Sequence, residues 1–209
     1  MIFNNIIEKL LTDPIHLRVF KTLRLHPEGL TGRTLGVLVK TSSFKINGVV
    51  RFLVALGVIT QTVVGRAHLY RLNEHHILIQ DVINYLIDYE TNLLNKLGET
   101  IMDQLPRKPL SIILYGSIAR GDEAPLSDVD LLLIYKDNAK PGLISQTAPM
   151  IEWINRNYGN TASIRQVFIS EFQKPEPEHK TLIRNIIKEG KSIAGLTITE
   201  ILNYHDKNG

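Results

Sequence analysis

The chain has 209 residues and a formal net charge of +3, and 44% of its residues are hydrophobic while 22% are charged. This composition is typical of a globular protein with a sizeable core, so it excludes a disordered or fibrous chain. Cysteine is absent, which excludes disulfides and thiolate metal sites, and no apolar run is long enough to span a membrane. We therefore expect a cytoplasmic protein with no membrane contact.

Charge is distributed unevenly along the chain. Residues 13–72 hold nine lysines and arginines against two acids, a net charge of +7, whereas residues 73–105 carry −5. A basic segment beside an acidic one indicates a partner, and a local excess of positive charge is what phosphate binding requires. The alternative is chance clustering of charges on solvated faces.

The first 75 residues contain helix signals followed by a strand pair. Asp13-Pro14 starts the first helix, Thr31 is a plausible N-cap of the second, and Gly57 closes the third. The predicted helices cover residues 17–25, 31–39 and 43–56. Predicted strands at 58–64 and 67–72 flank Gly65-Arg66 and form a hairpin. Three helices and a hairpin in this order predict a winged helix-turn-helix domain over residues 1–75.

A winged helix of this kind predicts DNA binding, with helix 43–56 in the major groove and the hairpin tip against the backbone or the minor groove. The predicted DNA-contacting residues are Ser42, Ser43, Lys45, Asn47, Arg51 and Arg66. Helix 43–56 is, however, apolar nearly all round, and such a helix is usually buried. The domain could therefore be a protein-contact or dimer module instead, and we expect a homodimer.

The run Gly65-Arg66-Ala67-His68-Leu69-Tyr70-Arg71-Leu72-Asn73 resembles the end of the wing in winged-helix regulators that are fused to small nucleotidyltransferase domains. The resemblance extends back to Arg33 without a gap, and it continues into a second motif at 115–134. It implies a DNA-binding transcriptional regulator.

Residues 76–105 are predicted to form a linking helix, because their apolar residues recur at helical spacing. This apolar stripe is best explained as a core or dimer face. A short Pro-rich segment follows, and residues 106–209 then form a third region. Its predicted strands are 110–115, 128–135 and 164–169, and its predicted helices are 148–158 and 179–194, the latter ended by Gly195. This is an α+β domain with a small mixed sheet.

The strongest chemical signal lies between the first two of these strands. Gly116-Ser117 follows a strand and precedes a helix, where a glycine backbone and a hydroxyl can approach a phosphate. Arg120, one helical turn after Ser117, could pair with a phosphate oxygen. Asp128 and Asp130 are two residues apart on a strand, so both carboxylates share a face and can bind a hard cation. A tight turn followed by a capped strand is the alternative, but it leaves Asp130 unexplained.

This arrangement resembles the polymerase-beta-like nucleotidyltransferase superfamily in its minimal form. Gly116, Ser117 and Arg120 match its phosphate-loop positions, while Asp128 and Asp130 match its catalytic metal ligands. The resemblance implies a nucleoside triphosphate, with ATP favoured, and Mg²⁺ or Mn²⁺ as cofactors.

Active members of the superfamily use a third carboxylate on a later strand. In this chain the matching position is predicted to be Gln166, with Glu171 as a substitute if the register slips. A glutamine can coordinate a metal through its carbonyl oxygen, but it cannot act as a base. Whether the domain is an enzyme is therefore left open by the sequence.

Three functions follow from these patterns. The leading one is a DNA-binding transcriptional regulator whose nucleotidyltransferase-fold domain binds a nucleoside triphosphate and magnesium. The second is an active nucleotidyltransferase that moves a nucleoside monophosphate to a hydroxyl of a protein or small molecule. The third is an antitoxin-like partner of a companion protein.

Overall fold

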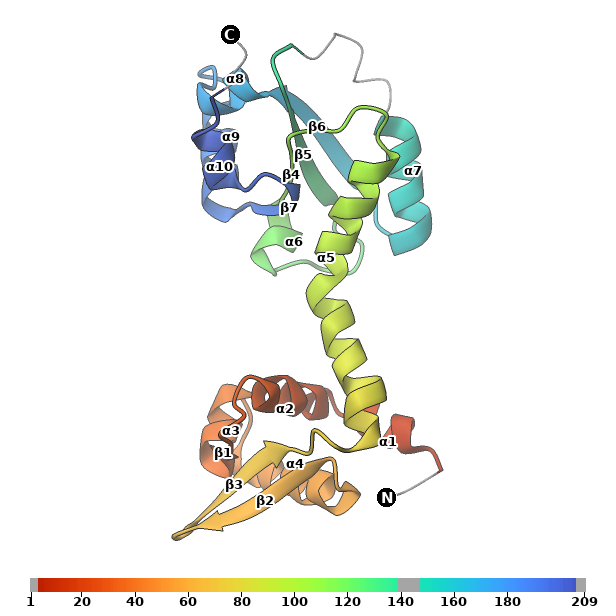
Figure 1. The fold of residues 1–209 in the computed structure, drawn as a ribbon, viewed down its shortest axis with the longest axis vertical. Coiled ribbons are helices and arrows are strands. Elements are labelled where there is room, and N and C mark those ends of the chain that lie inside the picture. The colour runs from red at the N-terminus through yellow and green to blue at the C-terminus, as the bar shows by residue number, and fades with distance from the viewer. Residues whose placement is uncertain (1–3, 139–146, 206–209) are drawn as a thin grey trace. The chain divides into compact units, whose positions relative to one another are not determined.

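The structure is a computed structural model, and it describes residues 4–138 and 147–205. The chain divides into two compact units, Met1–Thr91 and Asn92–Gly209 (Figure 1). The first has one hydrophobic core, and the second has two buried clusters. The division falls within a long helix, the segment that the sequence analysis treats as a separate linker. Within the described residues, no helix is both long enough and apolar enough to cross a membrane.

The N-terminal unit is a winged helix-turn-helix, as predicted. Its elements are α1 (Ile6–Leu11), α2 (Pro14–Arg24), β1 (Leu30–Thr31), α3 (Gly32–Leu38), α4 (Ser43–Leu56), β2 (Ile59–Val64) and β3 (Ala67–Leu72). The three strands form an antiparallel sheet in the order β1-β3-β2, and β2 and β3 extend together as the wing (Figure 1). Helix α1 and the two-residue strand β1 were not predicted from the sequence.

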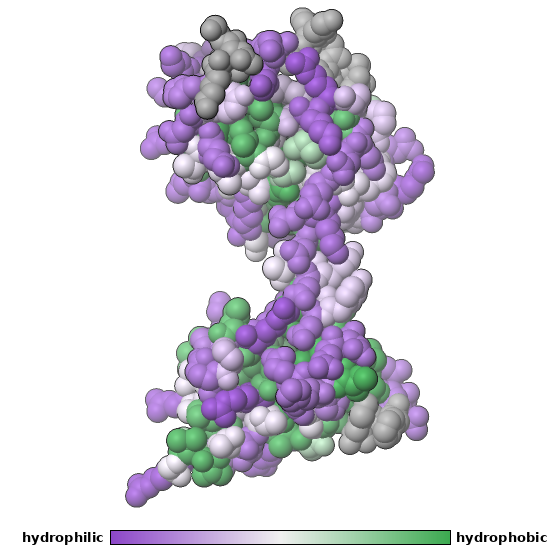
Figure 2. Space-filling view, viewed as in Figure 1, coloured by the Kyte–Doolittle hydropathy of each residue, from purple (hydrophilic) through white to green (hydrophobic). Residues whose placement is uncertain are grey.

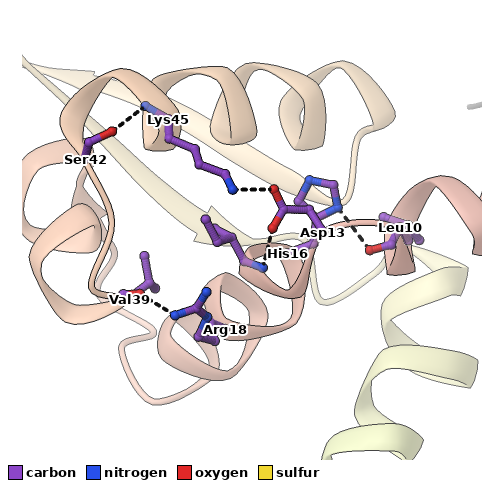
Figure 3. Close-up of polar contacts among 8 residues, drawn as sticks. Leu10, Asp13, His16, Arg18, Val39, Ser42 and Lys45 are labelled. Atoms are coloured by element: carbon purple, nitrogen blue, oxygen red, sulfur yellow. Dashed lines mark hydrogen bonds and ion pairs between the residues drawn. The ribbon is translucent and has the colours of Figure 1, made fainter.

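Side-chain caps set the ends of these helices. The Thr31 hydroxyl accepts a hydrogen bond from the backbone N–H of Thr34, which starts α3, and Gly57 ends α4 with a left-handed backbone. Figure 3 shows that Asp13 and Ser42 cap α2 and α4 in the same way, the Ser42 hydroxyl accepting from the N–H of Lys45 at 3.2 Å. The capping residues therefore determine locally where each helix of the helix-turn-helix begins.

Helix α4 is amphipathic rather than apolar all round. Its buried residues are Ile46, Val49, Val50, Leu53 and Leu56, which join the core of the N-terminal unit. Ser43, Phe44, Asn47 and Arg51 are exposed on the remaining surface. The prediction that residues 43–56 are apolar nearly all round is therefore wrong, because the buried residues lie on one face and Phe44 lies with the polar residues on the other.

The predicted linking helix begins as a π-helical segment, η1 (Ile79–Ile83), and continues as α5 (Asn84–Gln104). The residues of its apolar stripe belong to two different cores. Ile83 and Ile87 are buried in the core of the N-terminal unit, and Leu97 and Ile101 in a core of the C-terminal unit. The stripe is thus a core face, which was one of the two explanations predicted from the sequence, the other being a dimer face.

The C-terminal unit contains a four-stranded mixed sheet, also as predicted. Its elements are β4 (Ser111–Tyr115), α6 (Gly116–Arg120), β5 (Val129–Tyr135), α7 (Thr147–Tyr158), β6 (Ala162–Phe168), α8 (Ile169–Gln173), α9 (Lys180–Glu189), β7 (Lys191–Gly195) and α10 (Ile198–Leu202). The strand order is β6-β5-β4-β7, with β5 and β6 parallel and the other pairs antiparallel. Side chains of α5 and α7 cover one face, and those of α8, α9 and α10 cover the other.

The predicted helix over residues 179–194 is wrong in its last five residues. Helix α9 ends at Glu189, and Lys191–Gly195 forms β7, which pairs with β4. At Gly190 the backbone is extended, and a β-carbon there would lie too close to the carbonyl oxygen of Ile186. Gly195 consequently ends a strand and not a helix.

Candidate functional site

The site is built around the turn from β4 into α6. Gly116 has φ +76°, a backbone conformation that favours glycine, and a β-carbon at this position would overlap the Oδ2 atom of Asp130. The overlap arises because Tyr115, the preceding residue, pairs with Asp130 across the β4–β5 ladder. The turn and the carboxylate are therefore in direct contact, although 14 positions separate them in sequence.

Asp128 and Asp130 enter the site at the start of β5. Asp130 is half-buried within the strand, whereas Asp128 is exposed immediately before it. The segment is anchored by the side-chain amide of Asn160, which donates to the carbonyl oxygen of Ser127 at 2.9 Å. Burial, and next the negative charge of Asp128, raise the pKa of Asp130. Two oxygen-donor carboxylates that are two residues apart, and of which one raises the pKa of the other, suit a hard divalent cation such as Mg²⁺.

The predicted phosphate residues lie on α6, a helix of only five residues. Ser117 is half-buried in its first turn. Arg120, at its end, donates through Nε to Asp122 at 3.1 Å and lies 3.7 Å from a carboxylate oxygen of Glu189. The hydrogen bond that Arg120 donates to Asp122 is the main reason why the pKa of Arg120 is raised. The structure thus brings Gly116 and Asp130 together, while the Arg120 guanidinium is engaged with carboxylates.

The third strand presents a residue other than the predicted one. In the parallel β5–β6 ladder, Asp130 lies beside Ser163 and Leu133 lies beside Gln166. Because side chains alternate along a strand, Gln166 shares the opposite face with Leu133, and Arg165 lies on the face of Asp130. The assignment of Gln166 to the site is therefore wrong by one residue.

Glu171 does not replace it either. This residue lies on α8, and its Oε2 atom accepts a hydrogen bond from the backbone N–H of Phe168 at 2.9 Å, which caps that helix. In the part of the chain that the structure describes, no group of three or more His, Cys, Asp or Glu side chains is placed to hold a metal. The candidate cation site therefore consists of Asp128 and Asp130.

A cavity of about 590 Å³ opens on the same face of the sheet, between β6, α8 and the start of α9. Its walls combine apolar side chains with basic and acidic ones, including Leu132, Arg165, Lys174, Glu176, His179 and Ile183. Arg165 belongs to both the cavity and the face of Asp130, so the two features adjoin. The sequence analysis contained no signal for this cavity, because its walls come from four separate segments.

The predicted DNA-contacting residues lie at the start of α4, along it, and at the turn of the wing. Ser43, Asn47 and Arg51 are exposed on the helix, and Arg66 is exposed at the hairpin turn. The other two also have structural roles, since the Ser42 hydroxyl caps α4 and the Lys45 ammonium lies 3.1 Å from Asp13 (Figure 3).

Part of the basic charge of the N-terminal unit is neutralised within the unit. Lys21 pairs with Glu90, and Arg24 lies 2.7 Å from Asp88, so acidic residues of α5 face basic residues of α2. Four other exposed bases differ from these. Within residues 4–138 and 147–205, no ion pair involves Arg33, Lys40, Arg51 or Arg66. Arg33, Lys40, Arg51 and Arg66 therefore add positive charge to α3, the α3–α4 turn, α4 and the wing, and the exposed Arg18 adds some to α2.

One residue of this surface was overlooked in the sequence. Phe44, in the first turn of α4, is 92% exposed, and Val37 on α3 is 71% exposed. Figure 2 shows apolar residues on the surface of the winged helix as well as polar ones. At helical spacing Phe44 shares a face with the exposed Asn47 and Arg51 and lies opposite the buried residues of α4. The sequence therefore contained a signal for its exposure, which its apolar character masked.

A comparison with known protein families agrees with the nucleotidyltransferase fold that was predicted for residues 106–209. Residues 95–196 match the family described as Polymerase beta, Nucleotidyltransferase. No curated protein matches the sequence.

Two solved structures are similar in part. A toxin–antitoxin structure with AMP-PNP shares 13% identity over 52% of this chain and 81% of its own, with a TM-score of 0.40. MepR, a transcription regulator of the Staphylococcus aureus multidrug efflux pump MepA, shares 19% identity over 47% of this chain and 75% of its own, with a TM-score of 0.37.

Proposed function

We propose that the protein is a DNA-binding transcriptional regulator whose nucleotidyltransferase domain binds a nucleoside triphosphate together with Mg²⁺. One observation supports the nucleotide part above all, namely the contact between Gly116 and Asp130. A phosphate bound by the backbone of the turn would lie beside a cation bound by the carboxylate. A turn that served only to connect two elements would not need this close approach.

Each side chain of the site has a role in this proposal. Asp128 and Asp130 would hold Mg²⁺ or Mn²⁺, and Gly116 and Ser117 would bind phosphate oxygens through the backbone and the hydroxyl. Arg120 would exchange its exposed ion pairs for a phosphate, at little cost because such pairs are weak. When bound, the cation would neutralise charge on the phosphates.

The DNA part of the proposal rests on the surface of the winged helix. Arg33, Lys40, Arg51 and Arg66 lie on the elements that a winged helix turns toward DNA. The exposed side of α4 combines Asn47 and Arg51, which can reach base edges, with the capping Ser42 at its start. Lys21 and Arg24 on α2 are paired with acids of α5, and on α4 Lys45 is paired with Asp13.

The nucleotide is identified by thermal unfolding of the whole protein with each of the four ribonucleoside triphosphates, with Mg²⁺ or with EDTA. A ligand at one hundred times its Kd stabilises the native state by about 2.7 kcal/mol, which for a protein of this size raises Tm by roughly 5–10 °C. We expect this rise only when both nucleotide and Mg²⁺ are present. Asp130→Asn should abolish it, and Asp103→Asn, the same substitution on the exposed face of α5, should not.

DNA binding is measured by fluorescence anisotropy on labelled genomic fragments at several salt concentrations. Each phosphate contact that is lost reduces the slope of log K against log salt by about 0.9. We expect Arg51→Ala and Arg66→Ala to weaken binding and to reduce this slope. Lys21→Ala removes the same charge from a residue that Glu90 already neutralises, and should leave both quantities unchanged. Binding that is insensitive to salt would argue for a protein-contact module.

An active nucleotidyltransferase is the second candidate, and the paired carboxylates Asp128 and Asp130 favour it. Incubation with α-labelled ATP, Mg²⁺ and candidate protein or small-molecule acceptors would then label a hydroxyl group. Label transfer that survives Asp130→Asn would show that the assigned site is not the one responsible.

Molar mass in solution tests the expected homodimer, and copurification from the native host tests the companion protein.

A further inference from the structure

We propose that Arg165 binds the phosphates of the nucleotide and takes the place of a second cation, so that the site holds one divalent ion and binds nucleotide without transferring it. This inference rests on the proposed function, because it assumes that a nucleoside triphosphate binds at Gly116 and Asp130. It makes the domain a nucleotide sensor.

The sheet places Arg165 on the side of the carboxylates. Its neighbour across the parallel ladder is Leu132, which lies two residues after Asp130 and therefore on the same face. Leu132 belongs to the core under α8 and α9, the core of that face. Arg165 itself is exposed and lines the adjoining cavity, so its guanidinium has access both to the carboxylates and to open space.

The positive charge of Arg165 favours the ionised forms of groups in the site. Its guanidinium is close enough to Asp130 and to the Tyr115 hydroxyl to attract negative charge on both groups. A second divalent cation at this position would need further anionic ligands, and it would be repelled by the guanidinium. Since no third acidic ligand joins Asp128 and Asp130 in the described residues, the site is suited to a single cation.

A guanidinium can supply much of what a second cation would supply. Its planar fork pairs with two phosphate oxygens at once and stays charged at all physiological pH values. It cannot, however, accept the proton of an attacking hydroxyl, and Glu171 is occupied as the cap of α8. The arrangement therefore binds and charge-compensates a triphosphate without providing a base for transfer.

The test is equilibrium dialysis of the whole protein against ATP and Mn²⁺, with manganese and adenine counted per chain. For the wild type we expect one Mn²⁺ for each bound nucleotide. Arg165→Asp should raise this ratio toward two, because it adds a carboxylate and removes the repulsion. Arg165→Gln should keep the ratio at one and weaken nucleotide binding by about 10- to 100-fold, the cost of losing a charged hydrogen-bonding partner.

Arg156→Asp, which makes the same change on α7 over the opposite face of the sheet, serves as the control and should behave as the wild type. Two Mn²⁺ per nucleotide in the wild type would overturn the single-cation inference and leave the proposed function standing. Unchanged affinity in Arg165→Gln would overturn the phosphate role. A wild type that binds neither nucleotide nor Mn²⁺ would overturn the proposed function as well.

Discussion

Replacing Gly116 by alanine tests the contact on which the site depends. Gly116 and Gly121 have nearly the same left-handed backbone, with φ +76° and +75°, and they bracket α6. They differ in their surroundings, because a β-carbon on Gly116 would overlap Asp130 Oδ2, whereas nothing lies within 4 Å of one on Gly121. Gly121→Ala is therefore a matched control for the cost of the backbone alone.

The expected losses of stability combine the cost of a left-handed backbone and the cost of the overlap with Asp130. Placing alanine in the left-handed region costs about 1–2 kcal/mol at either position. At Gly116 the displacement of the half-buried Asp130 adds about 1–3 kcal/mol, the usual cost of overpacking. Gly116→Ala should thus lower the free energy of unfolding by about 2–5 kcal/mol, and Gly121→Ala by about 1–2 kcal/mol.

Urea unfolding followed by tryptophan fluorescence measures these values for the relevant unit, because the single tryptophan, Trp153, lies on α7 in the C-terminal unit. In an Asp130→Ala background the extra cost of Gly116→Ala should vanish, since the overlapping oxygen is gone. Equal losses for Gly116→Ala and Gly121→Ala in the wild-type background would refute the reasoning, and with it the contact between turn and carboxylate.

Three further outcomes follow from the structure. Because burial and then Asp128 raise the pKa of Asp130, ionisation costs native stability without a cation. The wild type should therefore lose stability relative to Asp130→Asn as pH rises from about 4 toward 7, measured as Tm against pH, and a constant difference would contradict this. Gly98→Ala should destabilise the C-terminal unit by about 1–3 kcal/mol in urea unfolding, since its β-carbon would overlap the carbonyl oxygen of Ile193. If Phe44 contacts thymine methyl groups in DNA, replacing thymine by uracil should weaken binding of the wild type in anisotropy titrations but not of Phe44→Ala.

Much of the N-terminal unit could be predicted because its signals are local. Asp13, Thr31 and Ser42 are capping residues, and each accepts a hydrogen bond from a backbone N–H within three positions of itself. Gly57 ends α4 through its own backbone. Such contacts depend on a few neighbouring residues, so the sequence contains them directly.

Long-range pairing was harder to predict. The strand β7 has five residues and follows a helix without a polar turn, so its pattern merges with that of α9. Its strand identity comes from pairing with β4, some 80 positions earlier in the chain, and that pairing has no local signature. The acidic residues of α5 likewise neutralise bases of α2 that lie far away in the sequence.

The same reason explains the site. The residue types and the spacing of Gly116, Asp128 and Asp130 follow from the sequence. The residue that faces them from β6 depends on the register of two parallel strands, and a shift of one residue turns every side chain to the other face. This is why Gln166 was predicted at a position that Arg165 holds in the structure.

Calorimetric titration of ATP into the whole protein, with Mg²⁺ and then with EDTA, tests the central claim most directly. If the turn at Gly116 and the carboxylates form one nucleotide–cation site, ATP should bind with Mg²⁺ and not with EDTA. Binding should disappear in Asp130→Asn and persist in Asp103→Asn. ATP binding that needs no divalent cation, or that Asp130→Asn leaves intact, would contradict the account.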